Sequence, residues 1–75
     1  MEIRKGIFDY GGEVDIKTDI EERCRIAIRK RGQYYEIYKA YFDYPEEEVL
    51  FRSKSLKEVV EFSNKKFNMN DWVKE

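Results

Sequence analysis

Arginine and tyrosine side chains recur in one stretch of the chain, between positions 23 and 42. A guanidinium pairs with phosphate and a phenol ring stacks on a base, so the combination suits single-stranded nucleic acid. The same residue types dominate the hot spots of protein–protein interfaces. They also form ordinary cross-strand contacts on the solvated side of a sheet, which is the structural alternative. The residues concerned are Arg25, Arg29, Arg31, Tyr34 and Tyr38.

Other chemistry is poorly supplied. The sequence contains no histidine, the commonest general base and metal ligand. Gly11-Gly12 matches neither glycine-rich phosphate motif. The acidic runs at 21–22 and 46–48 are typical of solvated turns, since a hard-metal site draws ligands from several segments. We therefore expect no catalytic, cofactor or metal site, and a protein that is not an enzyme.

Cys24 is the single cysteine, so an intramolecular disulfide and a cysteine-based zinc site are excluded. A free cysteine is usually a small core residue, and a reactive thiol is the alternative. One unpaired thiol fits a reducing compartment, and no apolar run approaches the roughly 18 residues of a membrane span. We expect a cytoplasmic protein that does not contact a membrane.

The net charge of −1 argues against a histone-like coat on DNA, which needs a strong cationic excess. Aromatic residues make up 16% of the chain, more than one helix can shield on one side of a sheet. The surplus indicates a surface for a protein partner or for self-association as a homodimer. Tyrosines at the rim, with their hydroxyls in water, are the simpler explanation.

The stretch from 23 to 42 must position these residues, and it reads as a β-hairpin. Gly32-Gln33 matches the Gly-X pattern of a two-residue type II′ turn. This turn pairs Arg29 with Glu36, and it fixes every other pair of the hairpin. Alternation then places arginines and tyrosines on one face, with Glu36. The opposite face is the core face, with Cys24, Ile26, Ile28, Ile37 and Tyr41.

A third strand over 48–52 follows a turn around Pro45. Its register is open by one residue, and we expect Val49 and Phe51, rather than Leu50, to face the helix.

The most regular pattern is helical. Ser55 and Glu58 form a capping box. A stripe with the helical period follows, ending near Asn68. Its members are Leu56, Val59, Val60, Ser63 and Phe67.

The two ends of the chain are less regular. An N-terminal hairpin is expected, with arms at 3–9 and 13–17 around Gly11-Gly12. Residues 18–22 form either a helical turn capped by Thr18 or a plain connection. Residues 70–73 start a further turn, with Trp72 folded back onto the core or the sheet edge.

These elements predict one small α+β domain over 1–75. We expect a twisted antiparallel sheet of about three to five strands against one C-terminal α-helix. The functional expectation is a small non-enzymatic interaction module, an adaptor, regulator or inhibitor that binds another protein through the Arg/Tyr surface, with a homodimer as one form of it. The alternative is a nucleic-acid-binding module that uses the same face.

Overall fold

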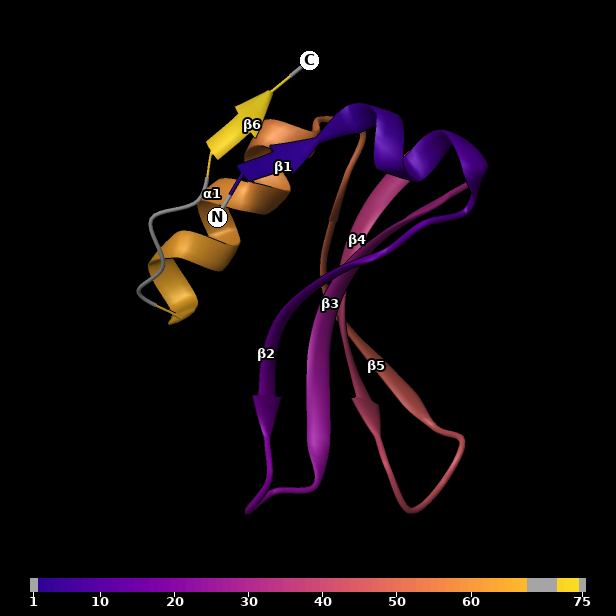
Figure 1. Ribbon diagram of the computed structural model, residues 1–75, viewed down its shortest axis with the longest axis vertical. Coiled ribbons are helices and arrows are strands. Elements are labelled where there is room, and N and C mark those ends of the chain that lie inside the picture. The colour runs from indigo at the N-terminus through magenta and orange to yellow at the C-terminus, as the bar shows by residue number, and fades with distance from the viewer. Residues whose placement is uncertain (1, 68–71, 75) are drawn as a thin grey trace.

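The computed structural model describes residues 2–67 and 72–74. It contains a four-stranded antiparallel sheet with strand order β2-β3-β4-β5 and one α-helix, α1, on one side (Figure 1). The predicted α+β fold is therefore confirmed. The elements span Val14–Asp19 (β2), Cys24–Arg31 (β3), Tyr34–Tyr41 (β4), Glu47–Ser53 (β5) and Leu56–Phe67 (α1).

The central hairpin has the register that its turn predicts. Arg31 pairs with Tyr34, Arg29 with Glu36, and the pairing continues without a shift to the far end of β3. Gly32 has φ +62°, whereas Gln33 is not among the residues with positive φ, as a type II′ turn requires. Because this loop is so short, it leaves the two strands only one way to pair.

The core lies between α1 and one face of the sheet, which we call the helix face. Ile28 and Ile37, a cross-strand pair, are completely buried there. The apolar stripe of α1 packs against them, and each such buried aliphatic side chain contributes roughly 1.5–3 kcal/mol. The buried residues of α1 are Leu56, Val59, Val60 and Ser63.

The start of α1 contains half of the predicted capping box. The Glu58 N–H donates to Ser55 Oγ at 3.4 Å. The return bond differs, because the Ser55 N–H donates to Ser53 Oγ at 3.1 Å, and this hydroxyl in turn donates to the Glu58 carboxylate. Ser53 therefore links β5 to the first turn of the helix.

A β-bulge changes the faces of β5. Ile37 pairs with Phe51 and the next residue, Tyr38, pairs with Val49, so Leu50 is the extra residue. Phe51 faces the helix as predicted, and its ring stacks on that of Phe62 at 4.9 Å. The prediction for Val49 and Leu50 is wrong: the bulge moves Val49 to the opposite face, where it is 39% exposed, and Leu50 packs against the core instead.

The predicted N-terminal hairpin is not formed. Only its second arm is part of the main sheet, as β2, where a bulge separates Asp15 from Lys17. The first arm divides into a short strand, β1 (Glu2–Arg4), and a 3-10 helix (Lys5–Tyr10). β1 pairs in parallel with β6 (Trp72–Lys74), so residues 72–73 belong to a strand and not to the expected turn.

The glycine pair ends this 3-10 helix instead of turning a hairpin. Gly11 has φ +78°, and the Gly12 N–H donates to the carbonyl of Ile7 at 3.1 Å. This geometry directs Phe8 inward, where its ring meets Tyr35 edge to face at 5.4 Å.

The connection from β2 to β3 is a turn over residues 20–23 in which Asp19 Oδ1 accepts the N–H of Glu22 at 3.0 Å. Thr18 lies within β2 and caps nothing. The predicted stop at Asn68 and the first part of the predicted turn, residues 70–71, lie outside the described residues.

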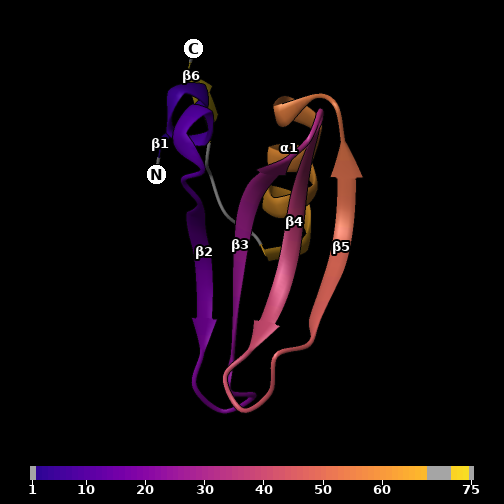
Figure 2. The same ribbon diagram turned by 90° about the vertical axis from the view of Figure 1, so that its right-hand side faces the viewer.

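The sheet is longer than the helix that covers it. α1 lies against the ends of the strands near the Gly32-Gln33 turn, and the opposite end of the sheet extends beyond it (Figures 1 and 2).

No helix within 2–67 or 72–74 is long and apolar enough to cross a membrane.

Candidate functional site

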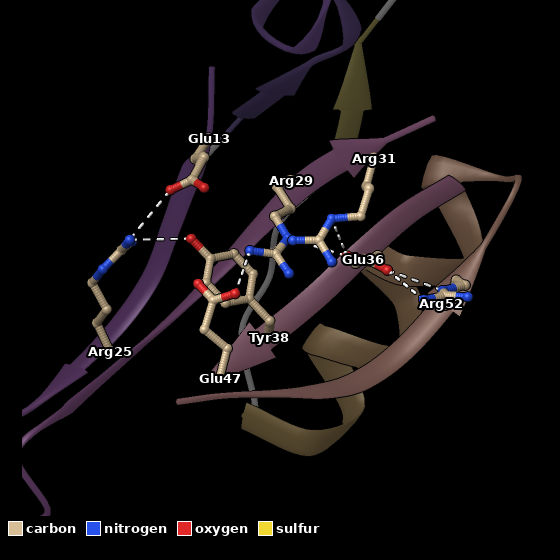
Figure 3. A network of polar contacts seen from close by, with 8 residues as sticks. All are labelled: Glu13, Arg25, Arg29, Arg31, Glu36, Tyr38, Glu47 and Arg52. Carbon is tan, nitrogen blue, oxygen red and sulfur yellow. Dashed lines mark hydrogen bonds and ion pairs between the residues drawn. The ribbon is translucent and has the colours of Figure 1, made fainter. Parts of the chain in front are cut away.

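The five predicted residues lie on the face of the sheet opposite α1, which we call the arginine–tyrosine face. β3 contributes Arg25, Arg29 and Arg31, and β4 contributes Tyr34 and Tyr38. Figure 3 shows that Arg25 and Arg29 converge on Tyr38, whereas the Arg31 side chain reaches toward Glu36. Tyr34 lies opposite Arg31, at the end of the hairpin.

Tyr38 is covered by arginine side chains. The guanidinium carbon of Arg29 lies 4.0 Å from the ring centroid and that of Arg25 lies 5.6 Å from it. Arg25 Nη2 also donates to the phenol oxygen at 3.1 Å. Tyr38 is only 1% exposed, although it lies on the face of the sheet opposite α1 (Figure 2). Arginine reaches such a position because its apolar stem lies along the sheet while its charged end stays near water.

Glu36 is the ionic centre of the face. Its side chain is 1% exposed and bonds two arginines from flanking strands, Arg29 at 3.1 Å and Arg52 at 2.8 and 3.0 Å. Burial alone would raise the pKa of the Glu36 carboxyl. The hydrogen bonds from Arg29 and Arg52 outweigh burial and lower the pKa, so the carboxylate is firmly ionised.

Further carboxylates complete the pairing. Arg25 contacts Glu13 at 3.3 Å and Asp15 at 3.0 Å, and Arg29 also contacts Glu47 at 2.9 Å. Burial would lower the pKa of Arg29, but the bonds to Glu47 and Glu36 raise it. Arg25 and Arg29 are therefore fixed cations that the chain itself neutralises.

One end of the face is more open. The Arg31 side chain is 62% exposed, and its Nε lies 3.9 Å from Glu36 Oε1, a weak contact. Tyr34 is 40% exposed. Arg52 and Lys54 approach the Tyr34 ring at 5.5 and 5.6 Å from its centroid. Of the predicted residues, Arg31 and Tyr34 are the pair most accessible to a partner.

The acidic half of the network was not among the predicted site residues. Glu36 was placed on this face by the hairpin register, but its burial depends on Arg29 and Arg52 lying over it. Arg52 pairs with Glu36 across β4 and β5, a pairing that becomes visible only with the bulged register. No local pattern marks Glu13 or Glu47, because each meets its arginine through a tertiary contact.

A groove of about 280 Å³ lies on the helix face, where the sheet extends past the end of α1. Its charged rim carries both signs in balance, with Lys17, Lys39 and Lys66 facing Asp19, Glu22 and Glu48. Cys24 lines it with only 1% exposure, as its predicted core role requires. Burial raises the pKa of the Cys24 thiol. The groove thus contains a protonated thiol of low reactivity.

No protein-family model, curated protein or solved structure matches this chain. Within the described part of the chain, no group of three cysteine or carboxylate side chains is arranged to hold a metal ion. The arginine–tyrosine face holds all five predicted site residues.

Proposed function

We propose that the chain is a non-enzymatic interaction module, an adaptor, regulator or inhibitor that binds another protein through the arginine–tyrosine face. The observation that carries the proposal is the internal pairing of Arg25 and Arg29 with carboxylates. A face neutralised in this way offers little net charge to a polyanion. It does offer a partner protein the residue types found in interface hot spots.

The pairing also orders the face in advance. Binding usually immobilises long side chains, at about 0.5–1.5 kcal/mol each. Arg29 is held by two carboxylates and the Tyr38 ring, and its side chain is only 12% exposed. Such a residue loses little further freedom on binding. The exposed Arg31 and Tyr34 provide contacts that a partner can bury beside this rigid centre.

Affinity capture from a lysate of the source cells tests the proposal. The natural chain is compared with Arg31→Ala/Tyr34→Ala, which changes only the open end of the face. Tyr10→Ala is the matched control, since Tyr10 is 95% exposed on the 3-10 helix. We expect a protein that is retained by the natural chain and the control but lost with the double variant. Equal retention by all three, or no retained protein, contradicts the proposal.

A second candidate function, binding of single-stranded nucleic acid, has one observation in its favour. Tyr34 is an exposed ring with Arg52 and Lys54 beside it, an arrangement on which a base can stack next to its phosphate. Fluorescence anisotropy with labelled single-stranded and duplex oligonucleotides at low salt separates the two functions. Binding that weakens steeply with salt and with Arg31→Ala supports nucleic acid, and absence of binding contradicts this second function.

A further inference from the structure

The edge strand β2 has one side on which its backbone pairs with no strand of the described chain. β2 is the first strand in the order of the sheet, and no strand of the described chain pairs with its outer side (Figure 2). In an antiparallel ladder, alternate residues direct their N–H and C=O groups to opposite edges. Every second residue of β2 therefore presents backbone donors and acceptors outward, where they can pair with another strand.

The last residues of β2 are regular, because the bulge lies before them. Lys17 pairs with Ile26, Thr18 with Arg25 and Asp19 with Cys24. Lys17 and Asp19 thus lie on the helix face, where both line the groove, and Thr18 lies on the arginine–tyrosine face. Among the ion pairs of the described residues, none involves Lys17 or Asp19.

We propose that β2 pairs antiparallel with β2 of a second copy of the chain, with the two-fold axis at Thr18. In this register Lys17 lies directly opposite Asp19 of the second copy, on the same face, and the pair occurs twice by symmetry. Thr18 lies opposite its own copy, a favourable cross-strand pair.

Charge complementarity distinguishes this pairing from mere exposure of an edge. A lysine on an edge strand usually prevents pairing, because it meets an apolar or like-charged residue of the incoming strand. When β2 pairs with a second β2 about Thr18, however, each lysine meets the carboxylate of Asp19 on the same face. In an antiparallel pair of Lys17-Thr18-Asp19 segments centred on Thr18, opposite charges therefore face one another at both ends.

The other free edge, β5, lacks this property. Its bulge places Glu48 on the helix face, opposite Lys39, and Arg52 on the other face, opposite Glu36. A symmetric pairing about Leu50 would set Glu48 and Arg52 of the two copies on opposite sides of the sheet. Arg52 is moreover already bonded to Glu36.

The dimer would have one continuous eight-stranded sheet. Because the two-fold axis is perpendicular to this sheet, the arginine–tyrosine faces of both copies lie on the same side. The inference does not depend on what that face binds. The contact is short, so dimerisation should depend on protein concentration.

Cysteine cross-linking tests the register. In the proposed pairing, Thr18→Cys brings two thiols opposite one another at the Cα separation of a cross-strand pair, which is within the range of a disulfide. We expect a covalent dimer on mild oxidation. Val49→Cys, on the exposed edge β5, is the matched control and should stay monomeric. A monomeric Thr18→Cys, or equal cross-linking of Val49→Cys, overturns the proposal.

Charge exchange supplies a second, independent measurement. Lys17→Glu faces Asp19 of the second copy with a like charge, so sedimentation should show at least a tenfold weaker dimer. Asp19→Lys has the mirror defect, and an equimolar mixture of the two variants restores both pairs and the dimer. Circular dichroism confirms that each variant is folded, since Asp19 also holds the turn through Glu22. A natural chain that is monomeric at millimolar concentration, or Lys17→Glu dimerising as tightly as the natural chain, refutes the inference.

Discussion

Glu36 is a carboxylate on the outer side of a sheet, and it is nevertheless buried. Its two oxygens are bonded by Arg29 and Arg52, which exclude water from it. A glutamine at this position keeps the shape but leaves two guanidinium groups without their counter-charge. Since Arg29 is itself almost buried, we expect Glu36→Gln to lower the free energy of unfolding by about 3 kcal/mol. Urea denaturation measures this loss, and Glu46→Gln at an exposed turn should have almost no effect.

The pH dependence of the same variant identifies the cause. The pKa of Glu36 is lower in the folded chain than in the unfolded one, where a glutamate titrates near 4.3. Its charge therefore contributes stability above that pH and loses it as the pH falls through the folded-state pKa. We expect the deficit of Glu36→Gln to be largest near pH 7 and to shrink below about pH 4. A deficit that stays constant with pH would indicate a packing defect instead.

Cys24 gives a prediction about reactivity. Because burial raises its pKa, the thiol is protonated and inaccessible near neutral pH. Alkylation by iodoacetamide should be at least 100-fold slower in the folded chain than in urea, since reaction requires opening of the structure. Fast labelling of the native chain would support the reactive-thiol alternative.

At the residue scale, the sequence predicted the faces but not the burial of the site. Arg29 opposite Glu36 follows from the turn alone, because the pairing of a two-residue hairpin is fixed. The burial of Tyr38 does not follow, because it depends on where two flexible arginine side chains lie.

At the element scale, predictions held where local signals were complete. The residues of the Gly32-Gln33 turn and the apolar stripe of α1 are enough to predict these elements from the local sequence. The two single-residue bulges, at Ile16 and Leu50, cannot be predicted in this way, because neither is marked by a glycine or proline. The bulge in β5 is why Val49 was assigned to the wrong face.

The prediction of a hairpin at Gly11-Gly12 is wrong for a related reason, since glycines end a 3-10 helix as readily as they turn a hairpin. Position 12 has no room for a side chain. A β-carbon there would overlap the carbonyl oxygen of Ile7 and lie 2.8 Å from its Cγ2. We expect Gly12→Ala to destabilise the chain by about 2 kcal/mol, as overpacking does. Gly6→Ala, in the same 3-10 helix with open space around it, is the control and should be neutral in thermal melts.

At the scale of the whole molecule, the least predictable feature is the pairing of β1 with β6. It joins the two ends of the chain in parallel, and each strand has only three residues. Neither segment carries a local signal for pairing with the other, because the two strands lie far apart in the sequence and no turn connects them. The expected hairpin was based on the local turn signal at Gly11-Gly12. In the structure, β1 pairs with β6 instead.

Because α1 covers only one end of the sheet, we expect the two ends of the sheet to differ in local stability. Ile37 lies under α1, whereas Phe42, at the other end, is bonded to the Arg23 carbonyl at 2.9 Å without a helix above it. Both amides are in the ladder or its continuation, so a difference in hydrogen exchange reports opening and not the absence of a bond. We expect the Ile37 amide to exchange only on global unfolding and the Phe42 amide by local opening, about 100-fold faster after correction for intrinsic rates.

Truncation of the helix core separates these two routes of exchange. Val60 is buried against the helix face, and Val60→Ala should lower global stability by about 2 kcal/mol, which makes the Ile37 amide exchange about 30-fold faster. The Phe42 amide should keep its rate, because its local opening does not separate α1 from the sheet. If both amides accelerate equally, the sheet opens as one unit, and the end beyond α1 has no independent mobility.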